Sequence, residues 1–161
     1  MPFYTMPTEA ELTTIACFGL AENYLEETAA QLGKDKSKIN ACVIKACLKT
    51  SLENNVYTQT FYSEDGNPRA VFGMSPSGAV TYVEAVGTSP HMRAKWAKAT
   101  RTLPEMLMRA TGTKPWCYSD ARNGKAERLL HWYHFKNDPL KDITINGYKF
   151  KYYSYVPVAE S

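Results

Sequence analysis

The sequence lacks the features that mark several specialised classes of protein. No apolar run reaches the roughly 18 residues that a membrane-spanning helix needs, which predicts no membrane partner. The first seven residues carry no basic stretch followed by an apolar one, which argues against a signal peptide. No repeat, low-complexity tract or Ser/Gly linker divides the 161 residues. We therefore expect one domain over residues 1–161, with a core large enough to fold without metals or disulfides.

Motifs for metal binding and nucleophilic catalysis are also missing. There is no Walker loop, no G-x-S-x-G and no Cys–His catalytic signature. His131 and His134 are spaced to share one helix face, but no third ligand accompanies them, so we predict no metal site. The four cysteines form no CxxC pair and lie in apolar patterns, which predicts reduced core thiols in a cytosolic protein. They are Cys17, Cys42, Cys47 and Cys117.

Charge is present but unevenly distributed. Residues 1–89 hold six Lys/Arg and ten Asp/Glu, a net charge of −4, whereas residues 90–161 hold thirteen and six, a net charge of +7. Such an uneven distribution of charge is typical of a protein whose basic surface binds an acidic protein, a phosphate or a nucleic acid. An ordinary solvated charged face would give the same pattern.

The first half of the chain reads as helices followed by a β-meander. Thr8 and Glu11 form a capping box, so a helix is expected from near Glu9; helical character resumes to Leu32, with Gly33 as its stop. Ser37 is the expected cap of a third helix, with Ile39, Cys42, Val43 and Ala46 on one face. Residues 55–62, 69–74 and 79–86 are rich in β-formers and separated by turn signals, which predicts three antiparallel strands.

The second half alternates helix and strand. We expect a basic helix over about residues 91–110, a strand over 115–118, a helix from Gly124 and a closing β-hairpin whose turn is Asn146-Gly147, the preferred type I′ pair. The order of these elements predicts an α+β fold with N-terminal helices, a central meander, central helices and a C-terminal hairpin.

The turn and helix after residue 118 carry a resemblance to a known family. Asn123 can cap the helix, and Ala126, Leu129, Leu130 and Tyr133 then recur on one helical face. The pattern N-x-x-A-x-x-L-L-x-x-x-x-F resembles the fourth helix of the GNAT acyltransferases, whose usual form is N-x-x-A-x-x-L-Y-x-x-x-G-F. The resemblance implies a GNAT-like mixed sheet over most of the chain.

The residues that catalyse acyl transfer and bind acetyl-CoA in GNAT enzymes have no counterparts in this sequence. Leu130 stands where GNAT enzymes place the catalytic Tyr, and the acetyl-CoA loop of the type R/Q-x-x-G-x-G/A has no counterpart in residues 86–99. Trp96 and Lys98 occupy places where small residues belong. We therefore predict no catalytic and no cofactor-binding residue and lean towards a protein that is not an enzyme. The remaining candidates are Glu84 as a base, Tyr133 as an acid and Arg93 as an acetyl-CoA ligand.

The expected basic helix offers a candidate surface for a partner or a phosphate backbone. Its cations greatly outnumber its one acidic residue, Glu105, and Lys98 and Arg101 should cluster on one side with Trp96 close by. The candidate surface consists of Arg93, Lys95, Lys98, Arg101 and Arg109.

From about Arg69 onward, the chain is also similar to the internal virion protein A family of short-tailed podophages, GNAT-like proteins that lack the same catalytic features. The shared features are the basic helix, the aromatic strand Lys114-Pro115-Trp116-Cys117-Tyr118, the Asn-led turn and the terminal hairpin. This resemblance implies a phage morphogenesis protein that contacts structural proteins of the core or portal region. The protein would be found in the host cytoplasm during assembly, and the virion is a second possible location. It could also form a homo-oligomer.

Three functions follow as hypotheses. The first is a catalytically inactive GNAT-like phage protein that acts through protein–protein contacts and uses no cofactor. The second is a divergent N-acetyltransferase that binds acetyl-CoA through Arg93 and the backbone after Val86. The third is a nucleic-acid-binding accessory protein, whose affinity for DNA would fall steeply with salt.

Overall fold

The structure is a computed structural model that describes residues 6–157. The helices are α1 (Glu9–Phe18), α2 (Glu22–Leu32), α3 (Ala41–Leu52), α4 (Pro90–Ala99), α5 (Leu103–Thr111) and α6 (Gly124–Trp132), with short 3₁₀ turns η1 (Lys36–Lys38) and η2 (Pro139–Lys141). The strands are β1 (Tyr57–Tyr62), β2 (Pro68–Met74), β3 (Val80–Glu84), β4 (Trp116–Asp120), β5 (Phe135–Asn137), β6 (Ile143–Ile145) and β7 (Tyr148–Tyr155).

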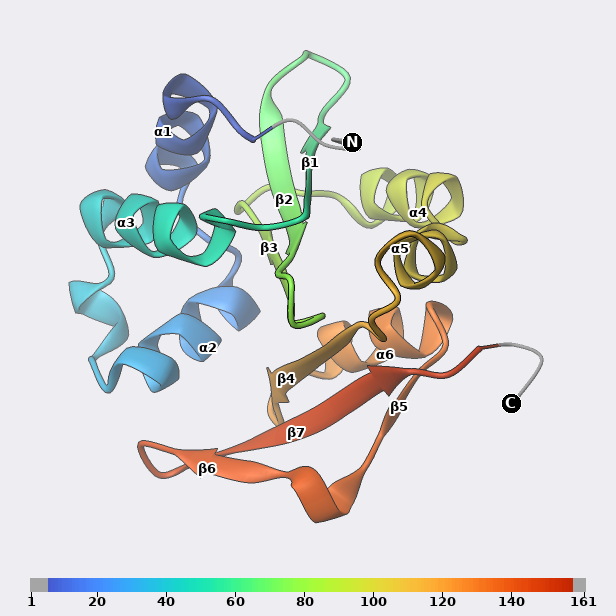
Figure 1. The fold of residues 1–161 in the computed structure, drawn as a ribbon. Helices are drawn as coiled ribbons and strands as arrows, with labels where there is room; N and C mark the ends of the chain where they lie inside the picture. The colour runs from blue at the N-terminus through green and yellow to red at the C-terminus, as the bar shows by residue number, and fades with distance from the viewer. Residues whose placement is uncertain (1–5, 158–161) are drawn as a thin grey trace.

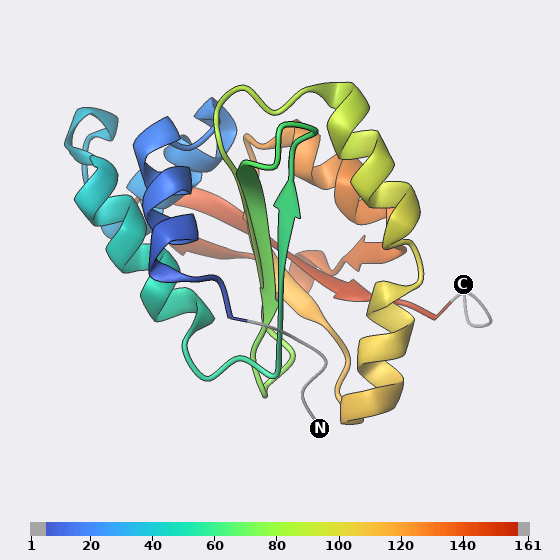
Figure 2. The ribbon, with the colours of Figure 1, turned by 90° about the horizontal axis from the view of Figure 1, so that it is seen from above.

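Two antiparallel sheets form the middle layer of the molecule. One has the order β1-β2-β3; in the other β7 lies between β4 and the two short strands β5 and β6. Helices α1, α2 and α3 cover one side of the strands, and α4, α5 and α6 cover the other (Figures 1 and 2). The predicted α+β class, central meander and closing hairpin are confirmed. No helix among residues 6–157 is long and apolar enough to cross a membrane.

The N-terminal helices begin as predicted for α1 and differently for α3. The Thr8 hydroxyl and the Glu11 carboxylate form the expected capping box, and Gly33 ends α2 in the left-handed conformation at φ 65°. Helix α3, however, is capped by Asn40, whose side chain accepts the Val43 N–H, and not by Ser37. The predicted inward face is also wrong, since the buried residues of α3 are Ile44, Leu48 and Leu52.

The prediction that the cysteines lie in the core is wrong for two of the four. Cys42 on α3 and Cys17 on α1 are exposed, while Cys47 and Cys117 are partly buried; all four are free thiols. The core between these helices and the first sheet is built instead from aliphatic side chains that are almost fully buried, namely Leu12, Ile15, Leu48, Leu52 and Val71.

The expected basic helix over residues 91–110 is two helices. Helix α4 ends at Ala99, and the Thr100 hydroxyl donates to the Trp96 carbonyl over 2.7 Å. Helix α5 then starts anew at Leu103 with Pro104 in its first turn, where the missing N–H of proline costs nothing. A proline in the interior of one long helix would have broken it, which explains the division.

The C-terminal elements follow the predicted pattern. The Asn123 side chain caps α6 by accepting the Ala126 N–H, and Asn146 and Gly147 have the positive φ angles of a type I′ turn, 49° and 85°. Strand β5 was not expected: the chain leaves α6 through His134, at φ 65°, and pairs with the end of β7.

Candidate functional site

The two sheets meet at one end and separate from there. Strand β3 pairs with β2 and strand β4 with β7, so each of the two keeps one edge without a ladder. Within residues 6–157 those two edges share one bridge, a parallel one between Ala79 and Trp116. The Trp116 N–H there donates to the Gly78 carbonyl over 3.0 Å. Beyond the bridge, the facing edges have no strand partner among the described residues.

Residues from the α1–α2 region attach to the far ends of both strands. The Ala21 N–H donates to the Glu84 carbonyl at the end of β3 over 2.9 Å. On the other side of the gap, the Glu27 carboxylate on α2 accepts the Asp120 N–H at the end of β4 over 2.7 Å. The gap between the strands is thus bounded by hydrogen bonds at both ends.

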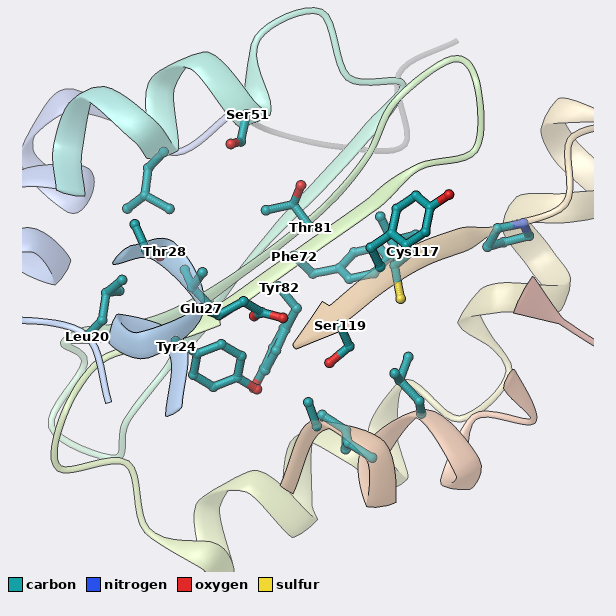
Figure 3. Close-up of a pocket in the computed structure, with 18 of the residues that line it drawn as sticks. Leu20, Tyr24, Glu27, Thr28, Ser51, Phe72, Thr81, Tyr82, Cys117 and Ser119 are labelled. Carbon is teal, nitrogen blue, oxygen red and sulfur yellow. The ribbon is translucent and has the colours of Figure 1, made fainter. Parts of the chain in front are cut away.

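A cavity of about 610 Å³ occupies the middle of this gap. Its volume lies within the range of small-molecule sites, roughly 300–1,000 Å³. Helices α2 and α3 contribute Tyr24, Glu27, Thr28, Gln31 and Ser51 to the wall. Helices α4, α5 and α6 contribute Arg93, Trp96, Leu107 and Leu130, and Tyr133 follows at the end of α6. Figure 3 shows the cavity between α3 and α6, with Tyr82 and Cys117 from the two sheets facing it. The crevice is therefore open and reaches both sides of the strands.

Glu27 is the titratable carboxyl of this cavity that stands out. It projects from α2 toward Tyr82 and Ser119 (Figure 3). Burial raises its pKa from an ordinary 4.5 to about 7, and the nearby Asp120 charge acts in the same direction. Hydrogen bonds from the Asp120 N–H and from Ser119 oppose that rise only in part. A carboxyl that changes charge near neutral pH can both hold a cation and accept a proton.

Sequence reasoning missed Glu27, although a local signal existed. Tyr24, Glu27, Thr28 and Gln31 recur at the spacing of one helix face, and all four line the cavity. On a helix whose opposite residues Ala29 and Ala30 are buried, such a partly polar stripe indicates a face that meets a cavity. This pattern does not, however, predict that β4 lies opposite this face of α2.

Glu84 and Arg93, the candidates for a base and a cofactor ligand, are bound to each other. The Arg93 Nε and Nη2 atoms each donate to one Glu84 carboxylate oxygen over 2.6 Å, and the Tyr82 hydroxyl donates to the same carboxylate over 2.7 Å. The Glu84 side chain is 1% exposed. This geometry leaves Glu84 as the buried partner of a bidentate ion pair, and it raises the pKa of Arg93.

Tyr133, the candidate acid, lies on the cavity wall with its proton already engaged. Its hydroxyl is 2.6 Å from the Thr100 hydroxyl, and Thr100 donates its single proton to the Trp96 carbonyl. Tyr133 must therefore be the donor to Thr100. Burial raises the pKa of Tyr133, so it keeps this proton at neutral pH. Leu130, one turn earlier, also lines the cavity and has no proton to give.

The candidate partner surface is distributed over α4, the following turn and α5, and most of its cations have a partner. Besides Arg93, Lys95 lies 3.9 Å from Glu64, and Arg109 pairs with Glu105 over 2.9 Å. The Arg101 guanidinium stacks on the Trp132 ring at 4.4 Å, whereas the expected neighbour, Trp96, packs against Phe61. Lys98 is exposed. A role of Arg93, Lys95, Lys98, Arg101 and Arg109 as one surface stays a prediction.

The two candidate metal-binding histidines do not share a helix face. His131 is in the last turn of α6, but His134 follows the helix end with a positive φ. Within residues 6–157 no group of three or more His, Cys, Asp or Glu side chains is placed to hold a metal ion.

Comparison with known proteins adds information on the fold alone. No protein-family model matches the chain, and no curated protein matches it significantly. Among solved structures, the aminoglycoside acetyltransferase AAC(6′)-Ib in complex with ribostamycin and coenzyme A is similar with a TM-score of 0.65. The two are 14% identical, and the match covers 96% of this chain and 93% of that one.

Two further acetyltransferases are similar in the same way. An acetyltransferase from Agrobacterium tumefaciens gives a TM-score of 0.58 at 14% identity, with 96% of both chains covered. A putative GnaT-family acetyltransferase from Bordetella pertussis gives 0.54 at 12% identity, with 88% of this chain and 91% of that chain covered. At such low identities the likeness concerns architecture and carries no residue roles.

Proposed function

We propose that this chain, which has the fold of the GNAT acetyltransferases, binds a small amine in its central cavity and transfers an acyl group to it from a thioester. The observation that carries the proposal is Glu27, whose carboxyl has a pKa of about 7 on the wall of a 610 Å³ cavity. The similar structure of AAC(6′)-Ib holds an aminoglycoside and coenzyme A. Its fold therefore accommodates an amine and a thiol-bearing molecule together.

Glu27 suits an amine for electrostatic reasons. An ionised carboxylate in a poorly hydrated cavity is stabilised by an ammonium group brought beside it, and it can accept the proton that the amine nitrogen loses during attack. Thr28 and Ser51 lie on the same side of the cavity and supply hydroxyls for a polar acceptor. The α4–α6 side, with Leu107 and Leu130, is suited to the apolar part of a thioester.

The reaction balances with Glu27 as the one protein group that moves a proton. The ammonium first loses one proton to solvent. The neutral amine nitrogen then attacks the thioester carbonyl carbon, and the second proton, which the nitrogen loses as the amide forms, goes to the Glu27 carboxylate. The new C–N bond forms and the C–S bond breaks. Because thiols ionise near pH 8.5, the sulfur can leave as a thiolate without an acid. This route agrees with Leu130 at the position of the family's acid and with a Tyr133 proton that is engaged elsewhere.

The test is a thiol-release assay with acetyl thioesters and a panel of amines that includes ribostamycin, spermidine and simple alkylamines. We expect saturable acylation whose kcat rises with pH to a plateau above about 7, and a loss of about 10²–10⁴-fold in kcat for Glu27→Gln. Glu53→Gln, an exposed glutamate after α3, is the matched control and should keep wild-type activity. No amine-dependent thiol release with any member of the panel would refute the proposal.

The other two functions stay predictions. The fold comparisons give no link to phage virion proteins, so binding to core or portal proteins rests on the sequence resemblance alone. A nucleic-acid role also stays a prediction; of its candidate cations, Arg93 is paired with the buried Glu84 and Arg109 with the surface residue Glu105.

A further inference from the structure

We propose that the acyl donor is recognised through a pantetheine-type thioester arm alone, without a site for a nucleotide pyrophosphate. This inference rests on the proposed function and specifies its donor. The GNAT fold implies coenzyme A, whose pyrophosphate would lie at the start of α4 on free backbone N–H groups. The residues present there do not fit that group.

The first turn of α4 has almost no N–H group to offer. Pro90 occupies its first position and carries no N–H. The Ser89 hydroxyl accepts the Met92 N–H over 3.1 Å, and the Ser89 carbonyl accepts the Arg93 N–H over 3.0 Å. His91 is left as the one first-turn amide without such a partner, where a pyrophosphate needs several.

The polar side chains of the preceding loop are engaged as well. The Thr88 hydroxyl donates to the Ala85 carbonyl over 2.8 Å. The two cations nearby are held in place: Arg93 by the buried Glu84, and Arg69 by the Phe18 ring at 4.1 Å and the Val86 carbonyl at 3.3 Å. Arg93 would have to give up its ion pair with Glu84 to bind a diphosphate. Arg69 has no carboxylate partner among the described residues, and its buried Nε makes no hydrogen bond, but it stands alone where a diphosphate needs several donors.

The cavity itself stops short of this loop. On α4 its wall includes Arg93, Trp96, Ala97 and Thr100, but none of residues 86–92 belongs to it. Between the Ala79–Trp116 bridge and the strand ends, in contrast, the facing edges of β3 and β4 have no strand partner in the part of the chain that the structure describes. An extended chain with amide groups can hydrogen-bond to such edges as an added strand does. The space thus matches a pantetheine arm and ends where a nucleotide would begin.

The experiment compares three molecules by isothermal titration: S-acetyl-pantetheine, acetyl-CoA and adenosine bisphosphate, the nucleotide half of coenzyme A. We expect the two thioesters to bind with dissociation constants within about threefold of each other, and the nucleotide not to bind. A preference of about tenfold or more for acetyl-CoA, or measurable nucleotide binding, would overturn this inference while leaving acyl transfer intact. Binding of neither thioester would overturn both this inference and the proposed function.

A double variant tests the physical reason. Ser89→Gly with Pro90→Gly frees the Met92 N–H and adds one at residue 90, and glycine is tolerated at a helix cap nearly as well as serine. Acetyl-CoA should then bind more tightly, with the affinity for S-acetyl-pantetheine unchanged. Equal affinities for acetyl-CoA in wild type and variant would show that the closed first turn is not what excludes the nucleotide.

Discussion

Replacing Glu27 by glutamine should stabilise the protein, and only above acidic pH. The carboxyl has a pKa of about 7 in the folded chain and about 4.5 when exposed, because burial disfavours its charged form. The folded state therefore holds the proton more tightly, and folding is opposed as the pH rises from about 4.5 to 7. At 1.36 kcal/mol per pH unit the full cost is about 3 kcal/mol, reached above pH 7.

Glutamine keeps an oxygen to accept the Asp120 N–H but never ionises. Because the Glu27 side chain is partly open to the cavity, we expect Glu27→Gln to raise the free energy of unfolding by about 1–3 kcal/mol at pH 8. At pH 4 it should have little effect. For a chain of this size each kcal/mol corresponds to about 2–4 °C in Tm.

Urea unfolding and thermal melts of both proteins across this pH range measure the effect, with Glu53→Gln as the exposed control. A Glu27→Gln variant that is destabilised at pH 8, or whose difference from wild type does not change between pH 4 and pH 8, would refute the electrostatic description of this cavity.

Two further substitutions probe the structure around the cavity. Arg93→Ala leaves the Glu84 carboxylate buried without its ion pair and should lower the free energy of unfolding by about 3–5 kcal/mol in urea titrations; a loss below about 1 kcal/mol would show that the ion pair contributes little to stability. Gly78→Ala places a Cβ 2.5 Å from the Lys114 carbonyl oxygen at a φ of 94°, so we expect it to weaken the joint between the sheets by about 2 kcal/mol or more, read as a lower Tm; an unchanged Tm would mean that the joint can shift.

The helix caps and turns could be predicted from the sequence because each is formed by residues that are close together in the chain. The capping box at Thr8, the left-handed stop at Gly33, the Asn123 cap and the Asn146-Gly147 turn all depend on residues close in the chain, and all four are present. The division between α4 and α5 had a signal in Pro104 that a reading based on charge overlooked.

The site was harder to predict because it depends on contacts between distant residues. Glu27 and Asp120 are 93 positions apart, and the pKa of Glu27 is set by what surrounds it after folding. Glu84 was recognised as a possible base from its strand, but its burial against Arg93 depends on how α4 folds back over β3. Sequence pattern identifies such carboxylates as candidates, and packing decides which of them remains available to a ligand.

The tip of the C-terminal hairpin bears on the order in which the chain can complete its cavity. The Asn146 side chain donates to the Ala30 carbonyl over 2.9 Å and to the Gln31 carbonyl over 3.2 Å, at the end of the helix that carries Glu27. Residues 30 and 146 are 116 positions apart. During synthesis α2 is made early, but these two carbonyls can accept the Asn146 hydrogen bonds only after most of the chain has been synthesised. Helix α2 should therefore be among the last elements to gain full protection from hydrogen exchange, and the cavity acquires its final shape only once the hairpin has docked.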